Sequence, residues 1–271
     1  MPTVLPDHTL VAVNTATASE NRIHDDDVAA AFGFRGGLVP GVDVYAYLCH
    51  APLEHWGERF LHRGEAALRL DAPIYHGQAT TIRARLDDDG RLQADAVSGG
   101  AVCATLTARL VDSHPEPFAT ADAPLPAAED RRPAAPDLLP PGRDLGTFTD
   151  RLAPEAADAF LADIGAPEGA LSGSGIVHPG WLLRHANGAL SRTVLLGPWI
   201  HVGSTVRLRA PLAVGAEFRV RGRVKDRYEH KGHRFVVLHV VIVGPDDQVV
   251  TDVEHTAIYE PRQVRSPTNS P

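Results

Sequence analysis

Two segments of the chain repeat one pattern, and this repeat constrains the fold more than any other feature. Residues 70–77 read Leu-Asp-Ala-Pro-Ile-Tyr-His-Gly, and residues 208–215 read Leu-Arg-Ala-Pro-Leu-Ala-Val-Gly, an offset of 138. Upstream of them, Val-Pro-Gly at 39–41 matches His-Pro-Gly at 178–180 with an offset of 139. Two anchors that agree to within one residue indicate that a single unit was duplicated and then diverged.

A stretch rich in proline and alanine separates the two units. Residues 113–143 contain eight prolines, too many for a helix or a central strand, so we expect a linker that runs along the surface. The predicted domains are therefore a first unit over 1–112, the linker over 113–143 and a second unit over 144–260. A flexible tail is expected over 261–271.

Each unit has the same expected order of a strand, a short helix, a longer helix and several further strands. In the first unit the longer helix begins at Pro40, since proline is favoured in a first turn. It is apolar nearly all round and must therefore be buried. Pro52 is expected to end or kink it. The counterpart in the second unit runs from Pro179 to about Val194.

The later segments of each unit have strand periodicity. Over residues 102–110 the even-numbered side chains are apolar and are expected on one face, with the odd-numbered ones opposite. Residues 235–243 are almost continuously apolar, which predicts a central strand. Turns are expected at 231–232 and 245–247. Six or so antiparallel strands after one buried helix predict a sheet wrapped around that helix.

Composition and charge exclude several classes of protein. A formal charge of −8 and a pI near 5.9 argue against a surface for nucleic acid. No apolar run reaches the roughly 20 residues that span a bilayer, and the start of the chain lacks a secretory pattern. Cys49 and Cys103 each lie in an apolar segment, as reduced core thiols do. We expect a soluble cytoplasmic protein without nucleic-acid or membrane partners.

A polar loop containing an imidazole precedes the buried helix of the first unit. Residues 21–24 read Asn-Arg-Ile-His, and an acid-capped short helix and a glycine turn at 36–37 follow. This order can place a proton-transfer group opposite the positive end of a buried helix. Such a geometry suits chemistry on an acyl thioester.

The doubled pattern and this loop resemble the MaoC-like family of (R)-specific enoyl-CoA hydratases and hydroxyacyl dehydratases. That family has an Asp-x-Asn-x-x-His loop, a short helix ending near Gly-Phe, and a His-Gly-Met start to its central helix. The matching stretches here are Ser-Glu-Asn-Arg-Ile-His at 19–24, Ala-Phe-Gly-Phe at 31–34 and Pro-Gly-Val at 40–42. Segments 176–181 and 255–259 resemble the family's other unit. The resemblance implies an α+β double hotdog, with two antiparallel sheets each wrapped around a central helix.

The sequence departs from the family at two positions. The family's catalytic Asp falls on Ser19, and the His of its second motif falls on Pro40, so the Asp/His dyad is incomplete. Glu20 is one residue out of register and is the alternative carboxylate. In the second unit no Asn-x-x-His loop precedes His178, which is either a degenerate copy of the helix-entry His or a group that enters the cleft.

The resemblance assigns catalytic roles to three residues. His24 would deprotonate or polarise the water, Asn21 would orient it, and the Gly41 amide would hold the thioester oxygen at the helix start. A purely structural interpretation is also open: Asn21 in an Asx-turn, His24 packed or facing solvent, and Gly41 required by backbone geometry. The expected substrate contacts are Ser19, Glu20, Val39, Pro40, Asp43 and His178. We expect no metal and no cofactor.

Three functions compete at this stage. The leading one is a hydro-lyase that hydrates or dehydrates an enoyl- or 3-hydroxyacyl thioester of coenzyme A or a carrier protein. The second is an acyl-CoA thioesterase that uses Asp43 in the first turn of the buried helix, although an acid there also complements the helix dipole. The third is a non-catalytic acyl-thioester-binding protein. Two fused units pair within one chain, and a homodimer of the fusion is also allowed.

Overall fold

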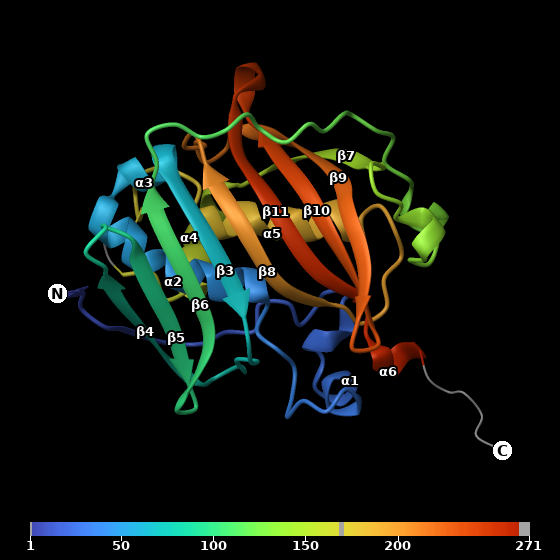
Figure 1. Cartoon of the computed structure of the whole chain (residues 1–271), viewed down its shortest axis with the longest axis horizontal. Coiled ribbons are helices and arrows are strands. Elements are labelled where there is room, and N and C mark those ends of the chain that lie inside the picture. The colour runs from blue at the N-terminus through green and yellow to red at the C-terminus, as the bar shows by residue number, and fades with distance from the viewer. Residues whose placement is uncertain (1, 168–170, 266–271) are drawn as a thin grey trace.

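One broad antiparallel sheet curves around two central helices (Figure 1). The fold is known from a computed structural model that describes residues 2–167 and 171–265. The helices α2 (Gly41–Trp56) and α5 (Pro179–Ser191) lie against each other on the inner face of the sheet. None of the helices in the described residues is long and apolar enough to cross a membrane.

The first unit has its small elements before the central helix and its sheet after it. Ahead of α2 come β1 (Thr3–Val4), β2 (His8–Val11), η1 (Arg22–His24) and α1 (Asp26–Ala31). After it come α3 (Glu58–Arg63), β3 (Gly64–Leu70), β4 (Ala79–Leu86), β5 (Leu92–Ser98) and β6 (Ala101–Leu110).

The second unit repeats this order behind the linker. The linker contains two short 3-10 turns, η2 (Ala128–Asp130) and η3 (Pro136–Leu138). The unit itself consists of β7 (Asp144–Arg151), α4 (Pro154–Asp163), α5, β8 (Ile200–Leu208), β9 (Glu217–His230), β10 (His233–Val243), η4 (Pro245–Asp247) and β11 (Val249–Glu260), followed by α6 (Arg262–Arg265).

The strand order shows the duplication directly. It runs β1-β4-β5-β6-β3-β8-β11-β10-β9-β7, and β2 pairs with β4. In both units one strand follows the central helix, and the last of the next three strands pairs with it. These pairs are β3 with β6 and β8 with β11. Isolated bridges Leu38↔Tyr75 and Ile176↔Ala213 recur 138 residues apart. The repeat found in the sequence is thus a repeat of the fold.

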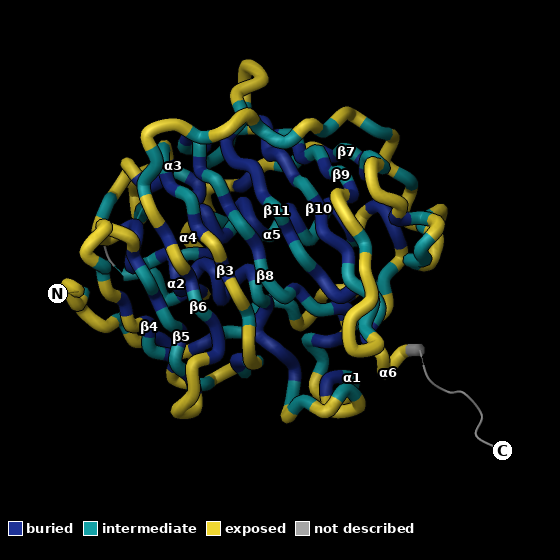
Figure 2. Tube along the Cα trace, viewed as in Figure 1, coloured by how far each residue is buried: buried dark blue, intermediate teal, exposed yellow. Residues whose placement is uncertain are grey.

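The two expected sheets are joined edge to edge. β3 of the first unit pairs with β8 of the second, from Glu65↔Arg207 to Arg69↔Gly203. This pairing leaves neither strand with an unpaired edge in the middle of the molecule. Figure 2 shows buried residues along the strands of both units, and these belong to one hydrophobic core cluster.

The helix α2 is buried as expected but does not end at Pro52. Tyr45 and Tyr47 are among the largest fully buried side chains, and the buried face continues through Pro52 to Leu53. The helix ends only at Gly57, which has a φ of +57°. Proline removes a single backbone hydrogen bond, and burial on both sides of Pro52 stabilises the helix past that loss.

Two strand predictions have different outcomes. β10 lies between β9 and β11, which confirms the predicted central strand. In β6 the predicted alternation fails at its start, because Val102 is 47% exposed whereas Cys103 is buried. A register shift against β5 between Ala96 and Val97 rotates this end of the strand.

The linker and the start of the tail are bound to the sheet. The linker crosses the surface, where the ring of Phe118 stacks on His239 at 3.6 Å and the Thr147 amide donates to the Ala123 carbonyl. In the segment expected to be a flexible tail, α6 forms a helical turn, and the Arg262 amide donates to His233. Residues 266–271 of that prediction lie outside the described residues, and the domain boundaries stay predictions.

Candidate active site

The polar loop is built from two local caps. The Asn21 side chain accepts from the Ile23 amide at 3.4 Å and caps η1. Asp25 then caps α1 by accepting from the Asp27 and Val28 amides. Both caps are short-range contacts, so the local sequence is sufficient to end η1 at His24. An Asx-type turn and a role in the site are therefore compatible interpretations of Asn21.

The hydrogen bond of His24 determines which of its nitrogens carries the proton. Its Nδ1 lies 2.6 Å from the Leu38 carbonyl, which can only accept, so Nδ1–H is the donor. The lone pair is then on Nε2, 3.4 Å from the Asn21 amide nitrogen. Burial lowers the pKa of His24, and the Leu38 carbonyl and the Asp43 charge oppose this shift only in part. His24 is therefore neutral at pH 7, and its basic Nε2 accepts the 3.4 Å hydrogen bond from the Asn21 amide.

The second unit holds Asn21 in place. Its side-chain nitrogen donates to the Trp199 carbonyl at 3.0 Å, and its oxygen accepts from the Trp199 amide at 3.2 Å. This two-way pairing fixes the amide orientation. The site thus needs residues from both units, although the loop itself belongs to the first.

The tip of α2 is uncapped. Pro40 has no side-chain group that could cap it, and the Gly41 and Val42 amides have no partner among the described residues. A Cβ at Gly41 would lie 2.4 Å from Leu70 and 2.8 Å from the His201 ring. A side chain at position 41 would therefore force Leu70 and His201 to move. The free amides and the helix dipole make the tip a site for a partial negative charge.

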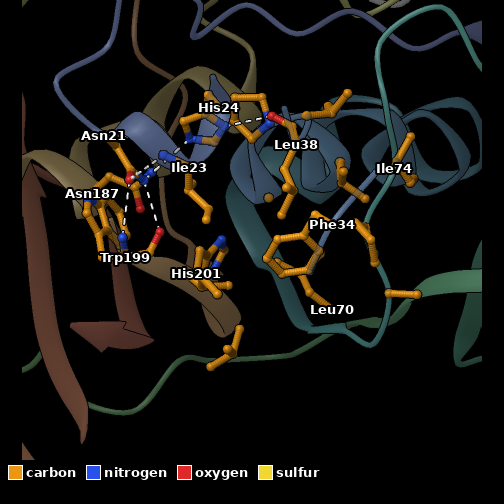
Figure 3. A pocket seen from close by; sticks show the side chains of 18 of the residues that line it. Asn21, Ile23, His24, Phe34, Leu38, Leu70, Ile74, Asn187, Trp199 and His201 are labelled. Carbon is orange, nitrogen blue, oxygen red and sulfur yellow. Dashed lines mark hydrogen bonds between the residues drawn. The ribbon is translucent and has the colours of Figure 1, made fainter. Parts of the chain in front are cut away.

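An inner cavity of about 200 Å³ lies beside this tip (Figure 3). His24 and Gly41 both line it, so the expected imidazole and helix tip share one cavity. In Figure 3 Asn21, Asn187 and Trp199 are grouped at one end, and Leu70 and Ile74 lie at the other. Most of its lining is apolar, including Ile23, Phe34, Leu38, Val44, Leu70, Ile74 and Ile200.

An outer cavity of about 510 Å³ adjoins the inner one and is more polar. Three arginines line it, and each is already paired with a carboxylate: Arg131 with Glu20, Arg184 with Asp43, and Arg192 with Asp150. The residues common to both cavities are Asn21, His24, Pro40, Asn187 and Trp199. His24 thus stands where an apolar chamber meets a polar one.

The expected substrate contacts near the loop have separate positions. Ser19 and Glu20 line the outer cavity, Val39 lines the inner one and Pro40 lines both. The Ser19 hydroxyl accepts from the Asn21 amide at 3.1 Å. Ser19 therefore supports the loop from within it but offers no carboxylate.

Asp43 does not reach either cavity. It is fully buried on α2, where its two oxygens bind Arg184 at 2.8 Å and the Thr15 hydroxyl at 2.5 Å. Neither cavity includes Asp43 in its lining. The expectation of a substrate contact at Asp43 is corrected, because an ion pair between α2 and α5 occupies the carboxylate.

His178 is also outside the cavities. Its Nδ1 accepts from the Gly180 amide and caps α5, and burial lowers its pKa to about 3. A Cβ at Gly180 would lie 2.3 Å from Ala46 of α2. The expectation that His178 enters the cleft is corrected, because the tip of α5 is capped and filled where that of α2 is open.

Comparisons with known proteins place the fold. No family model and no curated protein sequence matches the chain. A solved protein of Mycobacterium tuberculosis, described as a double hotdog, is 16% identical with a TM-score of 0.64 over 95% of each chain. A protein of Chloroflexus aurantiacus, named for a MaoC domain dehydratase, is 11% identical with a TM-score of 0.63 over 96% of this chain and 95% of its own.

This chain is a double hotdog. Its predicted α+β class and its resemblance to MaoC-like double hotdogs are confirmed at the level of the fold. A protein of Novosphingobium aromaticivorans assigned as a thioesterase matches too, 10% identical with a TM-score of 0.54 over 96% of this chain and all of its own. Double hotdogs thus carry both kinds of name, and the activity of this one has to be argued from its site.

Three residues of the second unit that belong to the double hotdog site were missed by the sequence reasoning. Asn187 lines both cavities, and its buried side-chain oxygen has no hydrogen-bond partner in the described structure. Trp199 pins Asn21, and His201 packs against Gly41. The polar Asn187 between the apolar Ala186 and Ala189 of the expected buried helix was the one available signal. Nothing local in the sequence points to the other two.

Proposed function

We propose that this double hotdog protein hydrates or dehydrates an acyl thioester, with His24 as its single proton-transfer group. One observation carries the proposal: His24, whose basic Nε2 accepts a long 3.4 Å hydrogen bond from Asn21, lies where the apolar and polar cavities meet, and the uncapped tip of α2 lines the same inner chamber. The acyl group would occupy the inner cavity, and the pantetheine arm of coenzyme A or a carrier protein would pass through the outer one.

Hydration would use His24 twice. Its Nε2 takes a proton from water while the water oxygen bonds to C3 of the enoyl group and the electron pair of the double bond moves towards the thioester oxygen. The Gly41 amide and the helix dipole stabilise the resulting enolate. The imidazolium then returns its proton to C2, so that water has been added and His24 is neutral again. Dehydration is the reverse.

The hydrogen bonds around His24 support this double role. The Leu38 carbonyl, 2.6 Å from Nδ1, stabilises the imidazolium that forms between the two transfers. Asn21, held by Trp199, keeps an amide next to Nε2 and would orient the water. A catalytic carboxylate is not required, since Nε2 of His24 removes a proton from water and delivers it to C2 on the same face of the double bond.

Hydrolysis through Asp43 has less support. Both of its oxygens are bound to Arg184 and Thr15, and it lines neither cavity. A non-catalytic acyl-binding protein differs from the proposal only in turnover, so the test has to measure turnover directly.

The test is His24→Ala assayed on a panel of enoyl- and 3-hydroxyacyl-CoA substrates for both water addition and thiol release. We expect kcat for water addition to fall about 10²–10⁴-fold, which is the usual contribution of a general acid–base group. The control is His230→Ala, because His230 is exposed on the β9–β10 hairpin. Unchanged hydration by the His24 variant, or thiol release as the main activity of the wild type, would overturn the proposal.

The pH profile gives a second readout. Because burial lowers the pKa of His24, its base form persists below the ordinary value of 6.5. The hydration rate should therefore rise with pH below that value and be level across neutral pH. A profile that rises only above about pH 7 would point to another base.

A further inference from the structure

The size of the inner cavity limits what it can hold. Its volume is about 200 Å³. An apolar protein cavity of roughly 150 Å³ takes up benzene, with its six heavy atoms, so this one has room for about eight. Because Gly41 lines the cavity, the thioester carbonyl must be counted among those atoms. One oxygen and about seven carbons fill the space.

The end of the cavity opposite Asn21 is bounded by the loop from Leu70 to Ile74, in which Ile74 is well packed. Ile74 is only 2% exposed, and the Val39 amide donates to its carbonyl at 2.9 Å. The adjacent bridge between Leu38 and Tyr75 ties the same loop to the start of α2. A longer chain could extend past Ile74 only by separating it from Val39. In Figure 3 Ile74 and Leu70 lie at the end of the cavity opposite Asn21.

We infer that this protein selects short acyl groups of no more than about seven carbons, with Ile74 and Phe34 setting the limit. This inference rests on the proposed function, since it assumes that an acyl thioester enters the inner cavity. Each methylene added within the limit should tighten binding about fourfold, because it moves from water into an apolar wall. Methylenes beyond the limit have no space and should weaken binding.

The duplicated fold provides a matched control. Leu212 is the counterpart of Ile74 at the offset of 138: its carbonyl accepts from the Val177 amide at 2.8 Å and it is also 2% exposed. Leu212 lines neither the inner nor the outer cavity. Truncating it removes similar core packing from the second unit without enlarging the acyl chamber.

The experiment measures binding of saturated S-alkyl thioethers of coenzyme A, which cannot react, by titration calorimetry on the full chain. In the wild type Kd should fall about fourfold per carbon up to roughly seven, and a twelve-carbon chain should bind at least about tenfold more weakly than the best ligand. Ile74→Ala should move the optimum about two carbons longer. Leu212→Ala should leave the optimum where it is.

A second variant tests the inference if Ile74→Ala does not fold. Phe34→Ala truncates a half-buried side chain that packs in the small cluster around Ile23 and Leu38, outside the main core, and it should also shift the optimum to longer chains. Tightest binding of the twelve-carbon thioether by the wild type, an equal shift with Leu212→Ala, or no binding of any thioether would overturn the inference. Length-limited binding without turnover would instead contradict only the proposed function.

Discussion

Glu20, the alternative to the carboxylate that the loop lacks at Ser19, is bound in an ion pair. Both Glu20 oxygens accept from Arg131, at 2.8 and 2.9 Å, and this pairing lowers the pKa of Glu20. Glu20 is therefore ionised at neutral pH and has no proton to donate. At the residue scale His24 is left as the one group beside both cavities that can exchange a proton near pH 7.

Glu20→Gln should accordingly leave kcat within roughly twofold of the wild type, because an exposed ion pair contributes little. KM for coenzyme A thioesters should fall, since Arg131 would face the outer cavity without its carboxylate partner. Steady-state kinetics at two salt concentrations would show this, and the decrease in KM should disappear at high salt. If turnover by Glu20→Gln instead drops about a hundredfold or more, the size expected for a general acid, Glu20 is the missing acid.

At the scale of elements, the contact between α2 and α5 accounts for Asp43, which the sequence reasoning assigned to the site. Asp43, Thr15 and Arg184 form a closed set of hydrogen bonds between the two helices and the N-terminal segment. The helices also differ at their tips, because His178 caps α5 whereas Pro40 cannot cap α2. Of the two duplicated helices, α5 thus has a capped N-terminus and α2 has an uncapped one.

Asp43→Ala should lower the free energy of unfolding by about 3 kcal/mol, because it leaves Arg184 without its partner at a buried interface. Hydration by the folded fraction should be nearly unchanged. Denaturant titrations of this variant, of Arg184→Met and of the double variant form a double-mutant cycle. Each substitution should lower the free energy of unfolding by less when the other is already present. Loss of thiol release by Asp43→Ala at an unchanged free energy of unfolding would favour the thioesterase alternative.

At the scale of the whole molecule, the β3–β8 pairing makes the two units one structure with a shared core. That core contains three histidines whose pKa values are lowered mainly by burial: His178 and His201 to about 3, and His255 well below its ordinary value. His201 and His255 contact the same Ser204 hydroxyl in the sheet behind the inner cavity. In the folded protein these three histidines are therefore neutral.

This burial predicts a loss of stability in mild acid. Above about pH 6.5 these histidines are neutral in both states, whereas below it only the unfolded chain takes up protons. Each one should then lower the free energy of unfolding by up to about 1.4 kcal/mol per pH unit. Thermal melts between about pH 6.5 and 5, above the range where carboxylates titrate, should show a falling Tm. A constant Tm there, or the same slope in His255→Gln, would contradict this.

The amino-acid sequence alone determined the features that depend on short-range contacts or on repetition: the caps that end η1 at His24, the buried helix after Pro40, and the two units. Each follows from neighbouring residues or from periodicity, and a few residues suffice to specify it. Only the tertiary structure decided that Trp199 holds Asn21, that Asp43 is bound by Arg184, that His178 caps its own helix, and that Ile74 lines the inner cavity. Those outcomes arise where side chains from distant parts of the chain compete for the same space and the same hydrogen bonds, and packing settles that competition only once the two units meet.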